Sequence, residues 1–251
     1  MPLLGPLTET IGVLLRHCSI RKYKPNPIPD EWLDAIVSAA QAASSSSHMQ
    51  AYTIIAVTND VTRSKLGELC GEANRTFMVQ CPLFLVWCAD LNRLDAVVEE
   101  AAGLQVPADI EHLLIASVDT ALAAQNAALA AESLGLGIVY VGGIRNHPAG
   151  VSKLLGLPRL TFPLFGMSIG FPDENPLQRP RLPRSVVFHE GRYDAGAWKE
   201  DIVEYDSEHS RYTNERSGGH SSISWTGRMA DRIANSRSGF ATFLKDQGFR
   251  L

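Results

Sequence analysis

The stretch DIEHLLIASVDTALAAQNAALAAESLGLGIVYVGG, residues 109–143, holds the longest predicted element of the chain and the turn that follows it. Apolar residues at helical spacing predict one helix over residues 109–134 that is unusually rich in alanine. These residues cover more than one stripe, so we expect the helix to be buried on most sides, in a core or at a subunit interface. Glycines end it, and a short strand over residues 138–141 leads into the pair Gly142-Gly143.

Shorter elements surround this stretch, and helices and strands alternate without a regular βαβ rhythm. The pattern leaves open whether the strands are parallel or antiparallel. The other expected helices cover residues 9–16, residue 30 to the serine run at 44–47, 60–70 on the surface, and 148–155. The other expected strands cover residues 52–58, 83–88 and 164–171. The proline-rich residues 172–183 predict an extended surface segment, and residues 195–251 predict a helical arm.

The composition is that of an ordinary globular chain. Hydrophobic residues make up 45% of its 251 residues, and 23 basic against 27 acidic residues give a formal net charge of -4. Nucleic acid is therefore not an expected partner, because binding to its phosphate backbone needs a dense basic surface. Residues 209–251 reverse the balance, with seven basic and three acidic residues. An anionic ligand would suit this arm, but a solvated helical face explains the charge equally well.

The cysteines and the hydropathy pattern indicate a cytoplasmic protein. The four cysteines form no pair at CxxC spacing, and Cys81 and Cys88 flank an apolar stretch in which a thiol packs as a small hydrophobe. Residues 1–10 lack the basic start and the cleavage site of a signal peptide. Polar residues such as Asp119 interrupt the longest helix, so we expect no membrane span.

Motifs for chemistry by side chains are missing from the chain. It contains no P-loop, no Gly-x-Gly-x-x-Gly, no HExxH and no Gly-x-Ser-x-Gly sequence. We therefore expect no catalytic side chain and no metal site. Arginine clusters together with a Gly-Gly loop favour chemistry that is carried by a bound cofactor.

Two N-terminal segments carry candidate binding residues. His17, Ser19 and Arg21 supply an imidazole, a hydroxyl and a guanidinium that suit a phosphate group. The alternative for this segment is a surface arginine beside a helix-capping serine. The serine run 44–47 and the residues up to Gln50 offer hydroxyl and backbone N–H donors to a phosphate or a flavin edge, and the alternative is a plain turn.

Two later segments carry further candidate binding residues, a glycine pair and an arginine pair. Gly142 and Gly143 let backbone amides approach a flat ring closely, and a strand-ending turn is the alternative. In Arg179-Pro180-Arg181 the proline holds two charges on an extended backbone, for which a basic surface loop is the alternative.

In this order and spacing, the four segments resemble the nitroreductase superfamily, in particular its NADPH-dependent branch of oxygen-insensitive major nitroreductases and NADPH-flavin oxidoreductases. The resemblance covers nearly the whole chain. It also rests on residues 118–121, 124–127, 131–137, 164–166 and 180–183. It implies an α+β fold with a mainly antiparallel central sheet flanked by helices, an intertwined homodimer, and one FMN per subunit at the dimer interface. Residues 1–251 would then form a single FMN-binding domain with residues 195–251 as a C-terminal helical arm.

The resemblance also assigns roles to individual residues. It implies that His17, Ser19 and Arg21 bind the phosphate and ribityl region of FMN. The residues implied to contact the flavin ring and its edges are Ser45, Ser47, Gln50, Tyr140, Val141, Gly142, Gly143, Arg179 and Arg181. Arg216 is implied to bind the 2′-phosphate of NADPH, and Arg237 to lie near its nicotinamide nucleotide.

The implied activity is that of an oxidoreductase. Hydride would pass from NADPH through FMN to a small-molecule acceptor, namely a nitroaromatic, a quinone or free flavin, in a ping-pong sequence. The same fold and cofactor also fit another acceptor or reaction, such as dehalogenation, oxidation or flavin conversion. A non-catalytic flavin-binding protein is the third interpretation.

Several positions depart from the family pattern. Cys18 stands where the family often has arginine, and His48 replaces an aromatic residue beside the substrate face. Gly71-Glu72-Ala73 stands where a Gly-Gly-Gln segment is expected. The segment 217–224 is less basic than the family loop, and a serine or His220 takes the place of an arginine. These changes bear on the acceptor and on the preference for NADPH over NADH more than on FMN binding.

Overall fold

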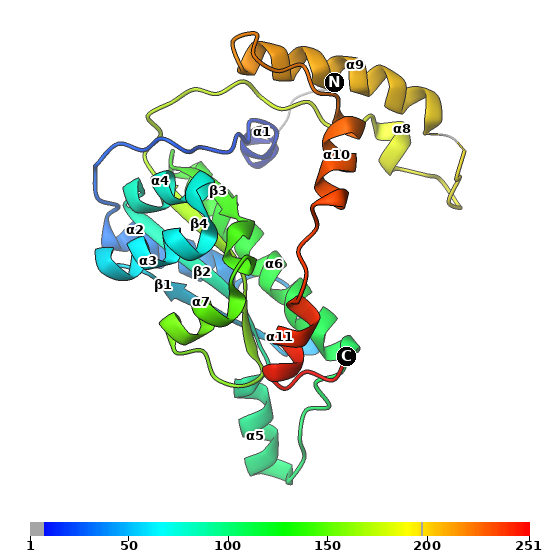
Figure 1. Ribbon diagram of the computed structural model, residues 1–251. Helices are drawn as coiled ribbons and strands as arrows, with labels where there is room; N and C mark the ends of the chain where they lie inside the picture. The colour runs from blue at the N-terminus through cyan, green and yellow to red at the C-terminus, as the bar shows by residue number, and fades with distance from the viewer. Residues whose placement is uncertain (1–7, 197) are drawn as a thin grey trace. The chain divides into compact units, whose positions relative to one another are not determined.

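The computed structural model describes residues 8–196 and 198–251. Residues 1–7, which carry most of the argument about a signal peptide, lie outside the described residues. The contacts divide the chain into two compact units (Figure 1). The larger unit comprises the residues up to Asn175 together with Ser238–Leu251, and the smaller unit comprises Pro176–Arg237.

The larger unit contains four strands and most of the helices. Its strands are β1 (Tyr52–Ala56), β2 (Leu83–Asp90), β3 (Gly137–Val141) and β4 (Thr161–Gly170). Its helices are α1 (Glu9–Leu15), α2 (Asp30–Gln41), α3 (Asp60–Cys70), α4 (Glu72–Gln80), α5 (Asn92–Ala102), α6 (Ile110–Ser133), α7 (Pro148–Leu155) and α11 (Phe240–Asp246). Two short 3-10 turns, η1 (Ser46–His48) and η2 (Gly142–Arg145), complete it.

The strands form one sheet in the order β1-β2-β4-β3, and every neighbouring pair is antiparallel. The sheet confirms the α+β fold with an antiparallel centre. Every residue of the central strand β2 is buried, as the continuous apolar run predicted. Trp87 of β2 lies opposite Ile54 of β1 and Phe165 of β4, and the register shifts immediately after it.

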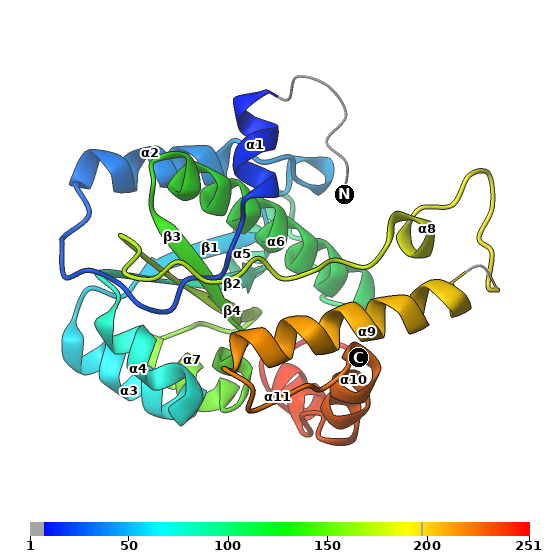
Figure 2. The same cartoon turned by 90° about the horizontal axis from the view of Figure 1, so that it is seen from above.

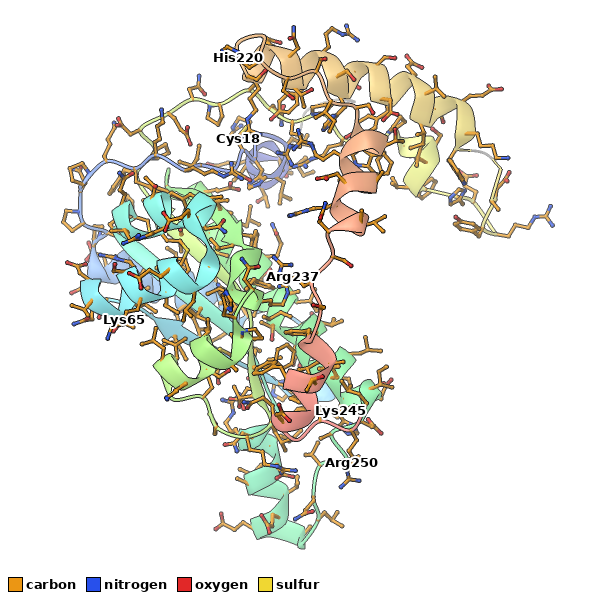
Figure 3. All side chains as sticks on the ribbon, viewed as in Figure 1. Cys18, Lys65, His220, Arg237, Lys245 and Arg250 are labelled. Carbon is orange, nitrogen blue, oxygen red and sulfur yellow. The ribbon has the colours of Figure 1, made fainter. Side chains whose placement is uncertain are left out.

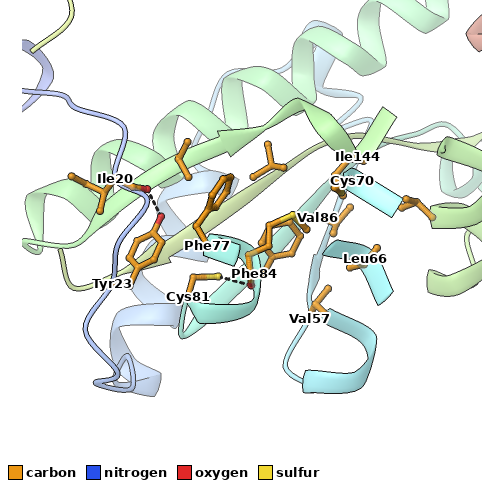
Figure 4. Packing of buried hydrophobic residues seen from close by; sticks show 14 of the residues in the cluster. Ile20, Tyr23, Val57, Leu66, Cys70, Phe77, Cys81, Phe84, Val86 and Ile144 are labelled. Carbon is orange, nitrogen blue, oxygen red and sulfur yellow. Dashed lines mark hydrogen bonds between the residues drawn. The ribbon is translucent and has the colours of Figure 1, made fainter. Parts of the chain in front are cut away.

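Alternating side chains of β2 divide the core of the larger unit into two layers. Phe84, Val86 and Cys88 pack with buried residues of α3, α4 and α7 (Figure 4). Leu83, Leu85 and Trp87 pack on the opposite face with residues of α2 and α6. Figure 2 shows the sheet between these two groups of helices. A third cluster, which includes Phe162 and Phe243, joins α11 to one end of the sheet.

Helix α6 is the longest element, and only one side of it is buried within the chain. Six of its alanines and two polar residues, Asp119 and Thr120, are buried, whereas Leu114 and Val118 on another side are 56% and 49% exposed. The single chain buries one side, and the burial of further sides that we expected in a core or at a subunit interface stays a prediction. The helix also has the length and mean hydropathy of a membrane span, which its polar residues did not lead us to expect. Its buried side packs against the sheet and α2, as in the core helix of a globular domain.

Side-chain caps explain where several helices begin. Thr8, Asn59, Asp109 and Ser224 each accept a hydrogen bond from the backbone N–H three residues later. Each cap satisfies one of the free N–H groups of a first helical turn and contributes about 1 kcal/mol.

The smaller unit is helical, as the sequence predicted for the C-terminal arm. It contains α8 (Arg184–Val187), α9 (Lys199–Arg216) and α10 (Trp225–Ala234). Tyr205 and His209 of α9 are buried, and the ring of Trp225 lies 6.0 Å from that of Tyr205. Asp206 accepts the backbone N–H of Thr226 at 2.9 Å, which ties α10 to α9.

Most expected elements are present, and α3 and α7 have the predicted bounds. The segment 172–183 contains no helix or strand, as expected. Helices α4 and α5 were not predicted from the sequence, and α3, predicted as a surface helix, buries Arg63, Leu66 and Cys70.

Candidate functional site

The segment 17–21 lies beside strand β3. Ser19 forms a parallel bridge with Ile138, and the backbone N–H of Ile20 donates to the carbonyl oxygen of Ile138 at 2.9 Å. Since β3 runs directly into Gly142 and Gly143, the structure brings two of the four candidate segments to the same edge of the sheet.

His17, Ser19 and Arg21 are partly exposed, whereas Ile20 between them is buried. The carboxylate of Glu174 fixes the backbone here, because it accepts the N–H of Arg21 at 2.5 Å and the N–H of Lys22 at 3.1 Å. The guanidinium of Arg21 donates to the carbonyl oxygen of Ser19 at 3.3 Å.

His17 is paired with a carboxylate of α6. Its Nδ1 lies 2.5 Å from Oε1 of Glu132, and both side chains are largely shielded from solvent. Nδ1 of His17 is thus engaged with Glu132, so Nε2 is the ring nitrogen left for the predicted contact with a phosphate.

The Gly142-Gly143 turn packs against the C-terminal end of α3. A Cβ on Gly143 would lie 2.6 Å from the carbonyl oxygen of Cys70 and 2.6 Å from Nδ2 of Asn74. The same carbonyl oxygen accepts hydrogen bonds from the side-chain amides of Asn74 and Asn146, each at 2.9 Å. Packing alone therefore requires glycine at position 143, whether or not a ligand approaches the turn. Tyr140, earlier in β3, places its ring 5.2 Å from that of Phe165.

The serine loop, residues 44–51, has an unusual backbone. Ser47, His48 and Gln50 have φ angles of 48°, 59° and 51°. The left-handed region costs a residue with a side chain roughly 1 kcal/mol or more, so three such residues need support from elsewhere. The buried carboxylate of Asp119 supplies it by accepting the N–H of Ser46 at 2.8 Å and the N–H of Ala51 at 3.1 Å.

Helix α6 contacts three candidate segments in turn. Asp119 holds the serine loop, Gln125 accepts a hydrogen bond from the hydroxyl of Tyr140 at 3.4 Å, and Glu132 pairs with His17. A helix rises about 1.5 Å per residue, so Asp119 and Glu132 lie roughly 20 Å apart along α6. Within one chain, Ser45, Ser47 and Gln50 are thus remote from the segment 17–21.

The buried cysteines do not take part in the candidate site chemistry. Cys70 is fully buried, and burial raises the pKa of its thiol to about 12. The pKa of Cys88 is raised to about 12 by burial and by the nearby Asp90. Both remain protonated near neutral pH, and only the thiolate is a good nucleophile. Cys81 and Cys88 lie in the core, as predicted. Cys18 is partly exposed.

The remaining candidates lie in the smaller unit. Arg179 and Arg181 are exposed on an extended segment, and the buried Tyr205 fixes the residue between them by donating to the carbonyl oxygen of Pro180 at 3.0 Å. Arg216 is the last residue of α9, and Arg237 follows α10 (Figure 3).

The loop after Arg216 is closed by its own hydrogen bonds. The hydroxyl of Ser217 accepts the N–H of Ser221 at 2.8 Å, and Gly218 and Gly219 adopt positive φ angles. His209 and Thr213 of α9 both bind the carbonyl oxygen of Ile223, at 3.1 and 3.0 Å. His220 lies in this loop (Figure 3).

Sequence reasoning missed the carboxylates that support the site. Asp119, Glu132 and Glu174 each hold a candidate segment, but none was predicted to do so. Asp119 left a signal, because it is an ionisable residue within an apolar helix. Among the residues that the structure describes, no group of three or more His, Cys, Asp or Glu side chains could hold a metal ion.

Comparisons with known proteins give matches along nearly the whole chain. The nitroreductase family model matches residues 14–171, and the model of the nitroreductase family C-terminal domain matches residues 179–251. An NADPH-flavin oxidoreductase of Vibrio harveyi is 39% identical over 244 residues, which are 96% of this chain and 98% of the relative. An oxygen-insensitive NADPH nitroreductase of Salmonella typhimurium is 38% identical over 245 residues, which are 97% and 99% of the two chains.

A solved structure is similar to this chain over nearly its full length as well. The NADPH:FMN oxidoreductase from Vibrio harveyi complexed with NAD+ gives a TM-score of 0.86 at 39% identity, over 96% of this chain and 99% of that chain. The similarity therefore extends over nearly the full length of both proteins.

Proposed function

The chain belongs to the nitroreductase family, and on this basis we propose that it is an FMN-dependent oxidoreductase that takes hydride from NADPH. Its acceptor would be a nitroaromatic, a quinone or free flavin. The observation that supports the proposal is the pairing of residues 17–21 with Ile138 of the edge strand β3, the strand that leads into the Gly142-Gly143 turn.

The chemistry of these donors fits FMN. A flavin phosphate, when buried, is an anion that needs a cation and hydrogen-bond donors, and His17, Ser19 and Arg21 would offer both. Their backbone is already ordered by Glu174 and Ile138, so little conformational entropy would be lost on binding. Ser45, Ser47 and Gln50 are proposed to border the flavin edge.

FMN, when bound, supplies the hydride-transfer chemistry, and the protein has to bind and orient it. The backbone amides of Gly142 and Gly143 would donate to the ring, and Tyr140 and Val141 would border it. Arg179 and Arg181 would place positive charge near the ring, which favours negative charge developing there. No side chain is needed as a general acid or base, because an open site lets solvent supply protons.

The proposal is tested by an anaerobic visible spectrum of the purified protein. We expect a flavin spectrum that NADPH bleaches and NADH bleaches more slowly, followed by reoxidation with a quinone or a nitroaromatic. Steady-state lines should be parallel, because one flavin serves both half-reactions. A protein that holds no flavin after purification and none after reconstitution with FMN would overturn the proposal, and intersecting lines would contradict the ping-pong sequence.

Arg216 is proposed to bind the 2′-phosphate of NADPH, and Arg237 to lie near the nicotinamide nucleotide. Replacing Arg216 by alanine should raise the KM for NADPH roughly tenfold, because a charged hydrogen bond contributes about 1.5 kcal/mol or more. The KM for NADH and the amount of bound FMN should stay unchanged. Arg228→Ala, an exposed arginine of α10, is the matched control. An equal rise in the KM values for NADPH and NADH would disprove the assignment of Arg216 to the 2′-phosphate.

We further propose that the protein is a homodimer and that it is cytoplasmic. Ile110, Leu114, Val118 and Leu122 recur every four residues along α6 and are 63%, 56%, 49% and 43% exposed. Such an apolar row is typical of an interface. A second copy would also supply the serine loop that lies about 20 Å along α6 from the segment 17–21. The unpaired, buried thiols fit a reducing compartment.

A further inference from the structure

The backbone of the serine loop is held by two side chains that lie far from it in sequence. Asp119 of α6 accepts the N–H groups of Ser46 and Ala51, at 2.8 and 3.1 Å, from residues 73 and 68 positions away. On another part of the loop, the guanidinium of Arg93 donates to the carbonyl oxygens of Gln50 and Tyr52, at 2.8 and 2.9 Å.

The two N–H groups that Asp119 binds enclose the strained part of the loop. Ser47, His48 and Gln50 all lie between Ser46 and Ala51, and all three have positive φ. A backbone of this kind persists only where its surroundings fix it from both ends. The carboxylate therefore holds both ends of the loop, Ser46 and Ala51, in place. The conformation of the residues between them depends on these two hydrogen bonds.

The burial of Asp119 indicates that its hydrogen bonds to the serine loop are needed to stabilise the carboxylate. The residue is 1% exposed in a helix whose neighbouring buried positions are mostly alanines. A carboxylate in such surroundings is costly unless hydrogen bonds compensate for the lost water, and both of its oxygens are used on the loop.

We propose that Asp119 is a positioning residue of the flavin site, which holds the serine loop so that Ser45, Ser47 and Gln50 face the cofactor. This inference rests on the proposed FMN function. It adds that the affinity for FMN is set partly from inside α6, by a side chain that does not itself touch the cofactor.

The variant Asp119→Asn keeps the shape of the side chain and removes one acceptor. The amide oxygen can still accept one N–H, whereas the amide nitrogen faces the other N–H as a second donor. We expect the amides of Ser46 and Ala51 to exchange their hydrogens about tenfold faster, with β2 amides unchanged. We also expect the Kd for FMN, measured by quenching of flavin fluorescence, to rise about tenfold, because a charged hydrogen bond that orders the loop is lost.

The matched control is Asp95→Asn. Asp95 lies on α5 in the same unit and also accepts a backbone N–H, from Val106 at 2.8 Å, in a loop outside the candidate site. This variant should open its own loop and leave the Kd for FMN within about twofold of the parent protein. If both variants weaken FMN binding equally, the effect is a general loss of stability and the proposal is wrong.

A second variant covers the case in which Asp119→Asn does not fold. Arg93→Lys alters an exposed side chain, which can no longer reach both carbonyl oxygens from one planar group. It should raise the Kd for FMN about threefold and change the visible circular dichroism of the bound flavin.

Two results separate this inference from the proposed function. If the parent protein binds FMN and Asp119→Asn opens the loop yet binds FMN equally tightly, the positioning role is overturned while the proposed function stands. If the parent protein binds no FMN at all, the proposed function fails and the inference fails with it.

Discussion

Replacing Arg21 by alanine should give a folded protein that no longer retains FMN. Removing one partner of a largely buried ion pair costs about 3 kcal/mol, which corresponds to a rise of more than a hundredfold in the Kd for FMN. The fold should survive, because the hydrogen bond from the backbone N–H of residue 21 to Glu174 does not depend on the arginine side chain. Purified protein should therefore be colourless, and its free energy of unfolding without flavin should change by less than about 1 kcal/mol.

Arg250→Ala is the control for this experiment. Arg250 is an exposed arginine of the same unit, and its backbone N–H donates to the carbonyl oxygen of Ala108 (Figure 3). Its loss should leave the flavin spectrum unchanged. Retention of FMN by Arg21→Ala at the parent's affinity would show that the phosphate is bound elsewhere. A drop in the stability of the flavin-free protein would instead indicate that the guanidinium supports the fold through contacts such as that with Ser19.

The elements that the sequence predicted well are those whose apolar pattern follows directly from their burial. Strand β2 is an example, because alternate residues such as Phe84 and Leu85 enter opposite layers, so the whole run is apolar. Helix α5 was missed although Leu94 and Val98, four residues apart, pack against the third cluster; none of its residues is fully buried. Helix α4 was missed because Phe77, Met78 and Val79 are adjacent in sequence, which hides the helical period.

The candidate site was predictable only as a set of segments. Residue types indicated phosphate donors at 17–21, but the pairing with Ile138 depends on a contact across more than a hundred positions. The left-handed backbone at Ser47, His48 and Gln50 had no signal at all, since the run contains no glycine and its support comes from Asp119. Backbone propensities describe only the local preference of each residue type. In this loop the hydrogen bonds of a distant carboxylate override that preference.

The Gly142-Gly143 turn had two explanations from sequence, close approach to a flat ring or the end of a strand, and the structure adds a third that can be tested. Gly143→Ala would place a Cβ 2.6 Å from the carbonyl oxygen of Cys70, a backbone atom that cannot rotate away. Overpacking of this kind typically costs 1–3 kcal/mol, roughly. We expect the flavin-free protein to unfold at a lower temperature or denaturant concentration, and the Kd for FMN to rise because the turn is displaced.

The stability of the flavin-free protein decides between these explanations. If only the approach to the ring requires glycine, Gly143→Ala weakens FMN binding and leaves that stability unchanged. Gly12→Ala is the matched control, because its added Cβ meets only the flexible end of Arg16 at 3.0 Å, inside α1, where alanine stabilises a helix by about 1 kcal/mol relative to glycine. Combining Gly143→Ala with Asn74→Ala removes one of the two close atoms, so part of the lost stability should return. Full stability in Gly143→Ala alone would show that the contact with Cys70 relaxes without cost, and that glycine at 143 serves the cofactor and not the fold.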